Sequence, residues 1–423
     1  METREICEVI KGYKTPLYLF NMDELKNRVK DIKEILGGDV KVCYAMKANP
    51  FFLNELRDIA DAFEVCSFGE FAICEREEIP MEKIILSGVN KGREDVEGVL
   101  DRHNGRGVYT VESMQHLKIL NECALAKNLT IELLLRLTSG NQFGMDEEQI
   151  REIVKMRHEY PGVLIKGLQL YSGTQKKTTD INREELERMV ALSKDLEKEY
   201  GLKLERIEYG PGLSVDYFGT AAYNNTYDAV KELATIIKDT CEGFEVTLEM
   251  GRFIAASCGY FVSEIADIKN NQGQNYVIID GGINHINYYG QVMAMKVPAY
   301  SNVNVNGEIL EGIEVVEKME EFKKSKNGEF EDYLVSNCLE ACTVCGSLCT
   351  VADLVVKNLP LIEPQIGDKI IFRNIGSYSI TEGIYLFLSR KMPLVLAYSK
   401  DKGIEVYRDV YASDRINSRD VTL

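Results

Sequence analysis

The sequence predicts an α/β fold, a (β/α)8 TIM barrel followed by a separate C-terminal β domain. Two observations predict it. Short apolar, β-branched runs alternate with helical stretches from residue 41 to residue 251, whereas after residue 258 strands follow one another through turns with little helical periodicity. The length agrees, because 423 residues exceed one core of ordinary size and favour a large domain with a second one.

The first part of the chain supplies the strand–helix units that such a barrel requires. The eight predicted strands are residues 41–48, 63–67, 83–88, 107–111, 131–137, 166–171, 206–210 and 246–251. Helical periodicity fills the intervals, as in "ESMQHLKILNECALAK" and "REELERMVALSKDLEKEY". A doubly wound open sheet is the alternative architecture, but eight near-continuous apolar strands in a row favour closure into a barrel.

The flanking segments complete the predicted domain organisation. "TPLYLFN" at 15–21 is a predicted strand before the helix "MDELKNRVKDIKEIL", and we expect it to join the C-terminal β domain. That domain should contain strands in "YFVSEIADI", "NYVIIDGG", "DYLVSNCLEACTVCG", "DKIIFRNIG" and "GIEVYRD". The predicted boundaries are therefore 24–258 for the barrel, and 1–23 with 259–423 for the β domain.

Composition argues against several classes of function. The formal charge of −17 disfavours nucleic-acid binding, which needs a basic face. No apolar run is long enough to span a membrane and the N-terminus lacks an apolar signal region, so we expect a cytoplasmic protein. The eleven irregularly spaced cysteines are expected to be free thiols. Cys342, Cys345 and Cys349 lie close together, but without a second pair or a histidine nearby they predict no metal site.

The C-terminal ends of the strands form the active face of such a barrel. Polar and small residues gather at these ends: Lys47, Ser67, Glu70, Ser87, Arg136, Tyr171, Gly173, Thr174, Gly210, Gly212, Glu249, Gly251 and Arg252. A lysine at a strand end is ordinarily a solvated side chain. In this company we expect it to belong to a binding site.

Four of these features together suit pyridoxal 5′-phosphate. "YGPG" after the seventh strand and "EMGR" after the eighth offer glycines, backbone N–H groups and a guanidinium to a phosphate, although a single such turn is more simply explained as a tight βα connection. Lys47 would supply the amine for a Schiff base with the cofactor aldehyde. Glu249 would keep the pyridine nitrogen protonated, so that the ring can accept electrons.

Seven motifs, in order, resemble those of the fold-type III pyridoxal-phosphate-dependent decarboxylases, which include diaminopimelate, ornithine/arginine and carboxynorspermidine decarboxylases. The motifs are "YAMKANP", "GLQLYSGTQ", "EYGPG", "EMGR", "VIIDGG", "CGSLCTVADLV" and "GDKIIFRNIGSY". The resemblance covers almost the whole chain. It implies an alanine-racemase-type barrel with a C-terminal β domain, and a homodimer with shared active sites that decarboxylates an amino acid.

The resemblance also implies roles for individual residues. Lys47 would hold the cofactor, Glu70 would orient Lys47, and Arg136 would lie close to the ring. The phosphate side would be formed by Thr174, Gly210, Gly212, Gly251, Arg252 and Tyr378. Cys349 would cross the dimer interface into the partner's site, and after carbon dioxide leaves, Lys47 or Cys349 would protonate the quinonoid. Thr350 and Tyr378 would face the substrate.

The departures from the family pattern concern the substrate more than the cofactor. Tyr171 stands where the family usually has a histidine stacked on the ring, and an aromatic side chain can still stack there. Thr350 follows Cys349 where diaminopimelate decarboxylases have an acid, and "DGGINHINYYG" lacks the arginine that those enzymes use for the distal carboxylate. The Cys-Thr pairing, the "YSGTQ" motif and the "QFGMD" segment resemble a branch used in secondary metabolism, some members of which act on modified or carrier-protein-bound amino acids.

Two other functions remain open from the sequence. Some relatives with this fold have lost the cofactor and act as regulatory binding proteins. An amino-acid racemase can be built on the same barrel. Retention of Lys47, Glu249, Arg252, Cys349 and Tyr378 favours the decarboxylase over both.

Overall fold

The computed structural model describes residues 1–219, 226–312 and 329–419, together with 315, 317, 318 and 321. The described chain forms two compact units. The barrel unit contains Lys26–Ser214 and a later stretch that ends at Ile254. The β unit contains Met1–Leu25, a short segment that begins at Val215, and the chain from Ala255 onward. The sequence-based boundaries, 24–258 for the barrel and 1–23 with 259–423 for the β domain, differ in leaving that short segment within the barrel.

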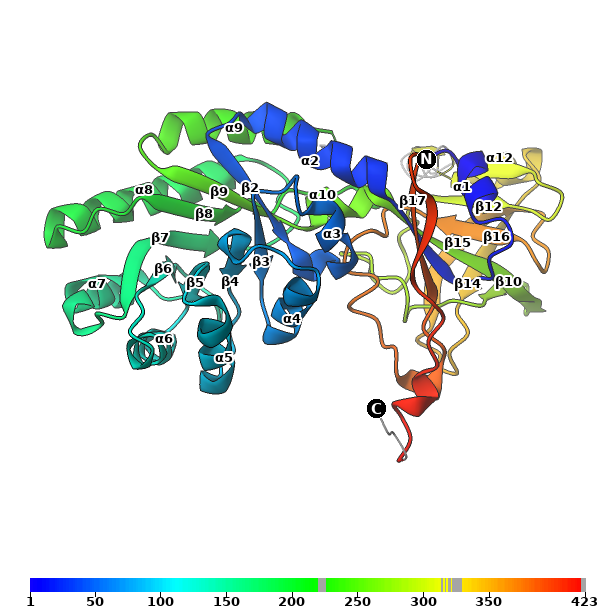
Figure 1. Ribbon diagram of the computed structural model, residues 1–423. Helices are drawn as coiled ribbons and strands as arrows, with labels where there is room; N and C mark the ends of the chain where they lie inside the picture. The colour runs from blue at the N-terminus through cyan, green and yellow to red at the C-terminus, as the bar shows by residue number, and fades with distance from the viewer. Residues whose placement is uncertain (220–225, 313–314, 316, 319–320, 322–328, 420–423) are drawn as a thin grey trace. The chain divides into compact units, whose positions relative to one another are not determined.

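Parallel strands of the barrel unit pair in sequence order, and the barrel closes where β2 pairs with β9 (Figure 1). The strands are β2 Val40–Ala45, β3 Ala62–Val65, β4 Ile84–Leu86, β5 Val108–Val111, β6 Ile131–Arg136, β7 Val163–Tyr171, β8 Arg206–Gly210 and β9 Glu245–Met250. Each overlaps one of the eight predicted runs. The prediction of a closed barrel rather than an open doubly wound sheet is confirmed.

Helices between the strands surround the barrel (Figure 1). They are α2 Met22–Leu36, α3 Leu53–Leu56, α4 Phe68–Arg76, α5 Arg93–His103, α6 Met114–Ala126, α7 Glu147–Lys155, α8 Asp180–Tyr200, α9 Asp228–Thr240 and α10 Arg252–Ala255. Several begin at a side-chain cap: Ser67 accepts from Glu70 N, and Ser113 accepts from His116 N. Such caps fix the residue at which each helix starts, and therefore the length of the turn between that helix and the strand before it.

The β unit is built on a mixed sheet, in which strands run in the order β13-β12-β16-β10-β1-β17-β18. The bounds are β1 Leu17–Asn21, β10 Gly259–Asn271, β11 Gln274–Ile279, β12 Tyr300–Val303, β13 Ile309–Glu311, β14 Leu339–Cys345, β15 Leu354–Ile362, β16 Lys369–Phe372, β17 Leu394–Ser399 and β18 Gly403–Arg408. As predicted, the N-terminal strand joins this sheet: β1 pairs with β10 and β17. Its fully buried Leu17 and Leu19 pack in one cluster with Val262 and Leu396, and helix α1 Thr3–Val9 contributes Ile6 to the same cluster.

One predicted strand is partly wrong. The first five residues of "DYLVSNCLEACTVCG" belong to helix α12, Glu329–Ser336, and the strand starts only at Leu339. Three acidic residues in the first turn of α12 favour a helix N-terminus there. Cys338 then takes a positive φ of 54° between the helix and the strand.

All eleven cysteines are free thiols. No helix in the described ranges has both the length and the apolar character needed to cross a membrane.

Candidate active site

Lys47 lies immediately after β2, in the short 3-10 turn Met46–Ala48. Asn49 stops this turn, and its side chain accepts from Phe51 N to start the next one. The amine is thereby directed into the barrel mouth. Lys47 Nζ donates to Glu64 Oε2 at 2.6 Å and lies 3.5 Å from Cys66 Sγ, and it sits 5.8 Å from the centroid of the Tyr171 ring.

Glu64 is the buried partner of Lys47, and the sequence did not single it out. It comes from the middle of β3, where its side chain is only 3% exposed. Burial by itself would raise the pKa of Glu64, but the charge and the hydrogen bond of Lys47 outweigh burial and hold the pKa below its ordinary value. The sequence did contain a signal for Glu64, since it is the one acid in an otherwise apolar barrel strand. A carboxylate buried in such a strand needs a charged or hydrogen-bonding partner, which pointed to a contact with a residue such as Lys47.

Glu249, near the end of β9, belongs to a buried polar network below the mouth. Gln169 on β7 donates from Nε2 to Glu249 Oε1, to Glu208 Oε1 at 3.0 Å and to Ser87 Oγ at 3.2 Å. Burial and the neighbouring charge of Glu64 raise the pKa of Glu249. The sequence predicted Glu249 and Ser87 at strand ends, but it missed Gln169 and Glu208. These two residues lie within β7 and β8, each two residues before the end of its strand.

The predicted phosphate side is assembled from the ends of β7, β8 and β9. Gly212 has a φ of +63°, and a Cβ placed on it would lie 2.0 Å from the carbonyl oxygen of Gly173. This close approach is tied by Lys176 N, which donates to Gly212 O at 2.9 Å. Arg252 Nε donates to Thr174 Oγ1 at 3.1 Å. The Gly212 turn therefore leaves no room for a side chain. A phosphate site requires such a turn, with backbone N–H donors exposed and a guanidinium such as that of Arg252 nearby.

Two further predicted residues lie in the wall of the barrel mouth. Glu70 Oε2 accepts from Cys66 N at 2.7 Å, so it holds the strand end that carries Glu64 and Cys66. Burial raises the pKa of Glu70, and the charge of Lys47 opposes that effect. Arg136 is buried and pairs with Glu112, with Nη1 3.1 Å from Oε1. The predicted roles of Glu70 in orienting Lys47 and of Arg136 beside the ring stay predictions.

The remaining predicted residues belong to the β unit. Cys349 and Thr350 are exposed on the loop between β14 and β15. Asp353 shapes this loop, since its carboxylate accepts from Leu348 N at 2.7 Å and from Ile283 N at 2.9 Å. Tyr378 has a φ of 65°. The predicted roles of these residues, Cys349 in the partner's site and Thr350 and Tyr378 beside the substrate, stay predictions.

The residues of the barrel mouth fit pyridoxal phosphate. Lys47 and Glu249 lie at the ends of the neighbouring strands β2 and β9. The Lys47 amine suits the cofactor aldehyde, and the buried Glu249 carboxylate suits the ring nitrogen. The Gly212 turn provides a cradle that any Cβ would fill. Gly210 adds to this fit, because a Cβ there would lie 2.5 Å from Cδ2 of Tyr171, so the glycine leaves space for that ring.

Comparison with known proteins agrees with this chemistry. Residues 22–256 match a family model described as "Pyridoxal-dependent decarboxylase, pyridoxal binding domain". The L-glutamyl-(BtrI acyl-carrier protein) decarboxylase of Niallia circulans is 25% identical, over 93% of this chain and 91% of its own. The 2-((L-alanin-3-ylcarbamoyl)methyl)-2-hydroxybutanedioate decarboxylase of Staphylococcus aureus is 24% identical, over 94% and 98%. The crystal structure of diaminopimelate decarboxylase from Methanocaldococcus jannaschii shares the fold, with a TM-score of 0.80, 22% identity and coverage of 98% and 94%.

Proposed function

The chain belongs to the fold-type III pyridoxal-phosphate-dependent decarboxylases, and from this premise we propose that it removes carbon dioxide from a modified or carrier-bound amino acid, with Lys47 as the residue that holds the cofactor. Membership makes it a carboxy-lyase with pyridoxal phosphate as its cofactor. The observation that carries the role of Lys47 is its amine, held by buried Glu64 at the same mouth as the glycine cradle.

The groups at the mouth divide the work. When bound, pyridoxal phosphate supplies an aldehyde for amines and a ring that accepts the electrons released by decarboxylation. Lys47 Nζ would hold the aldehyde end, and Glu64 Oε2 accepts the hydrogen bond that positions this amine. Glu249 would accept a hydrogen bond from the protonated ring nitrogen. Thr174, Gly212 and Arg252 would hold the phosphate.

The substrate's distal end is where this chain departs from diaminopimelate decarboxylases. Thr350 brings a neutral hydroxyl after Cys349, and the segment after β11 has Tyr288 and Tyr289 in place of a guanidinium. A site that lacks a charged partner loses about 1.5–3 kcal/mol for each charge-assisted hydrogen bond. Two of the relatives are named for a carrier-bound and a modified amino acid, which supports a substrate of that kind.

A second copy of the chain would complete the site. Exposed apolar side chains lie in three loops of the β unit, one of which carries Cys349: Val351 is 96% exposed, Met293 77% and Ile384 59%. Hydrogen bonds join the Cys349 loop to the other two: Arg390 Nη2 donates to Ser347 Oγ at 2.9 Å, and Ile283 N donates to Asp353 Oδ1 at 2.9 Å. An ordered, exposed apolar surface of this kind supports pairing with a second copy. Cys349 would then act in the partner's barrel.

Carbon dioxide release from a defined panel tests this function. The panel should contain free meso-diaminopimelate, free L-glutamate, an amide-modified amino acid and an aminoacylated carrier protein, each with wild type and Lys47→Ala. We expect turnover of a modified or carrier-bound member and none with Lys47→Ala. Turnover of free meso-diaminopimelate with a kcat/KM on the order of 10⁴ M⁻¹s⁻¹ or better would contradict the substrate assignment.

Covalent attachment of the cofactor is the second arm of this test. Borohydride reduction followed by peptide mapping should find the cofactor on Lys47. Lys91 is the matched control, because it is a buried lysine at the same end of the barrel, with Nζ 2.6 Å from Gly88 O. Labelling that persists in Lys47→Ala but is lost in Lys91→Ala would reassign the cofactor lysine.

A further inference from the structure

Three carboxyl groups and one amine meet inside the barrel, which is more acid than the proposed function uses. Glu249 would serve the ring nitrogen and Glu64 holds Lys47. Glu208, from the middle of β8, is only 3% exposed and has no part in either task. Gln169 Nε2 donates to the carboxyl groups of both Glu208 and Glu249, which brings their oxygens close enough for a hydrogen bond between them.

We propose that Glu208 is a protonated carboxylic acid that donates its hydrogen bond to Glu249, and that its proton exchanges with solvent through a pocket at the opposite, N-terminal face of the barrel. Glu208 is then a positioning residue, since it acts on the cofactor through Glu249. The proposal rests on the proposed function only for the contact between Glu249 and the ring nitrogen.

Hydrogen-bond chemistry requires a proton between the two acids. Two ionised carboxylates repel each other and cannot hydrogen-bond, so one of a closely spaced buried pair stays neutral. Burial raises the pKa of Glu208 well above its ordinary value, and the adjacent Glu249 raises it further. The pKa of Glu249 is raised mainly by burial, while its hydrogen bond with Glu208 lowers it. Glu208 is therefore the partner that keeps the proton.

The groups around Glu208 agree with this charge balance. Cys43 on β2 and Glu64 on β3 face it. Burial raises the pKa of Cys43 well above its ordinary value, so that thiol is neutral. Lys47 is matched by Glu64, and the ring nitrogen would be matched by Glu249. Among these described groups, none is left to act as counter-ion for a charge on Glu208.

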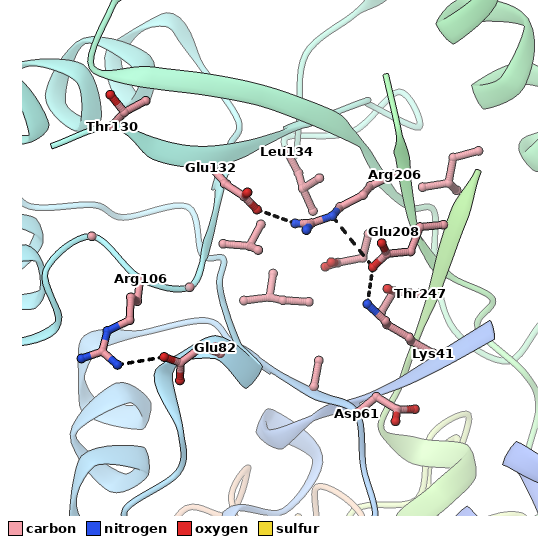
Figure 2. A pocket seen from close by; sticks show the side chains of 17 residues that line it. Lys41, Asp61, Glu82, Arg106, Thr130, Glu132, Leu134, Arg206, Glu208 and Thr247 are labelled. Carbon is pink, nitrogen blue, oxygen red and sulfur yellow. Dashed lines mark hydrogen bonds and ion pairs between the residues drawn. The ribbon is translucent and has the colours of Figure 1, made fainter. Parts of the chain in front are cut away.

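A pocket of about 430 Å³ reaches Glu208 from the end where the strands begin (Figure 2). Ion pairs ring it: Arg206 Nη1 lies 2.6 Å from Glu132 Oε2, and Arg106 Nη1 lies 2.8 Å from Glu82 Oε1. Glu208 and Thr247 line the same pocket. These ring cations have carboxylate partners, so the pocket offers little to an anionic ligand, but its polar lining suits water that can relay a proton to Glu208.

Infrared spectroscopy of the cofactor-free protein tests the protonation directly. The difference spectrum of wild type against Glu208→Gln at neutral pH should contain the C=O stretch of a protonated carboxylic acid. A carboxylate band in its place would overturn the proposal. This measurement uses no cofactor, so its result is independent of whether Lys47 and Glu249 have their proposed roles.

The effect on Glu249 has its own readout. The probe is pyridoxal phosphate with an isotopically labelled pyridine nitrogen, whose NMR shift reports whether that nitrogen carries a proton. Glu208→Gln keeps a neutral donor next to Glu249 and should retain the protonated shift, whereas Glu208→Leu should move the shift toward the unprotonated form. Equal shifts in both variants would contradict a role through Glu249. If Glu249→Gln also left the shift unchanged, the proposed contact of Glu249 with the ring would be wrong instead.

Deuterium exchange tests the route. The acid band of Glu208 should move on transfer to D₂O well before the amides of β7 and β8 exchange, because those amides are held in the barrel ladder. Exchange of the carboxyl proton only together with these amides would rule out access through the pocket.

Discussion

Lys47 and Glu64 form an ion pair in which the acid is buried and the amine is not: Nζ lies 2.6 Å from Oε2, Glu64 is 3% exposed and Lys47 36%. The pair joins the end of β2 to the middle of β3, two strands that are paired in parallel. The buried carboxylate stabilises the positive charge of the amine at this distance. Loading of the cofactor therefore has to separate this charge pair.

Glu64→Gln should shift cofactor loading to lower pH. Only a neutral amine attacks an aldehyde, and the variant removes the carboxylate that favours the charged form. The pH at half-maximal loading should fall by about 1 to 2 units, the usual effect of one opposite charge at close range. The measurement is the appearance of the cofactor absorption band after mixing with cofactor-free protein across a pH series.

Glu70→Gln is the matched control for that experiment. Glu70 is also a partly buried acid at the mouth, but its Oε2 accepts from the backbone of Cys66. We expect a much smaller displacement of the loading curve in this variant. Equal displacement by both variants would mean that general negative charge, not the Lys47–Glu64 contact, controls loading.

Gly212→Ala should weaken cofactor binding more than it weakens the fold. An alanine there takes a positive φ and brings Cβ within 2.0 Å of Gly173 O, so the phosphate cradle must open. We expect the cofactor affinity to fall on the order of tenfold or more, which is about 1.4 kcal/mol of binding free energy. Equilibrium titration of the cofactor-free protein with pyridoxal phosphate gives this value.

Gly201→Ala separates backbone strain from the loss of the cradle. Gly201 has a similar φ of +65° at the end of α8, with nothing within 4 Å of its Cβ position. It should lose about 1–2 kcal/mol of stability, the ordinary cost of the left-handed region, and bind the cofactor as wild type does. A comparable loss of affinity in Gly201→Ala would show that the cradle is not what Gly212 protects.

Much of this architecture was predictable because barrel strands are buried on both faces. Such strands read as nearly continuous apolar runs, so residues 41–48 and 131–137 could be recognised without an alignment, and strand ends led directly to Lys47 and Glu249. Position in the sequence gave no comparable guide to Glu64, Gln169 and Glu208. Each is one polar residue within an apolar run, and its partner lies on another strand that only the closed barrel brings near.

The β unit was predicted less well for a related reason. The helical segment Glu329–Ser336 is short and directly precedes β14, so its apolar residues extended the run that predicted the strand. Short helices and short strands share such patterns, and tertiary packing decides between them. That β1 joins this sheet was easier to predict, because an apolar strand before the first barrel helix needs another sheet to pair with, and its place between β10 and β17 came only from the structure.

Lys91→Met should change the free energy of unfolding in a pH-dependent way, being more favourable to stability at neutral pH than at high pH. Burial lowers the pKa of Lys91 from 10.5 to about 8, and the nearby Glu112 opposes that effect. Between those two values the unfolded chain binds more protons than the folded chain, so the stability of wild type rises with pH across this window. The methionine variant has no such dependence.

The difference in free energy of unfolding, variant minus wild type, should thus fall by about 3 kcal/mol between neutral pH and pH 10.5, since each pKa unit corresponds to about 1.4 kcal/mol. Urea denaturation at several pH values measures it. Lys177→Met, at an exposed lysine, is the control and should show a flat difference. A flat difference for Lys91→Met as well would mean that Lys91 remains charged throughout this range.

Mixing two inactive variants tests whether the site is shared between subunits. Lys47→Ala removes the cofactor lysine and Cys349→Ala removes the thiol of the exposed β-unit loop, so each should be nearly inactive alone. In a two-fold dimer with shared sites, a heterodimer carries both changes in one site and neither in the other. Random exchange makes half of the dimers heterodimers, so activity should recover to about a quarter of wild type.

Subunit exchange must be verified independently, for instance by energy transfer between differently labelled chains. The control pair is Lys47→Ala with Gly212→Ala, two changes at the same barrel mouth. Both sites of that heterodimer carry one change, so this pair should show no recovery beyond the residual activity of Gly212→Ala. Absence of recovery with Lys47→Ala and Cys349→Ala after confirmed exchange would place Cys349 in its own chain's site or outside catalysis. Recovery near one quarter with the Cys349 pair alone would assign the thiol to the partner's barrel.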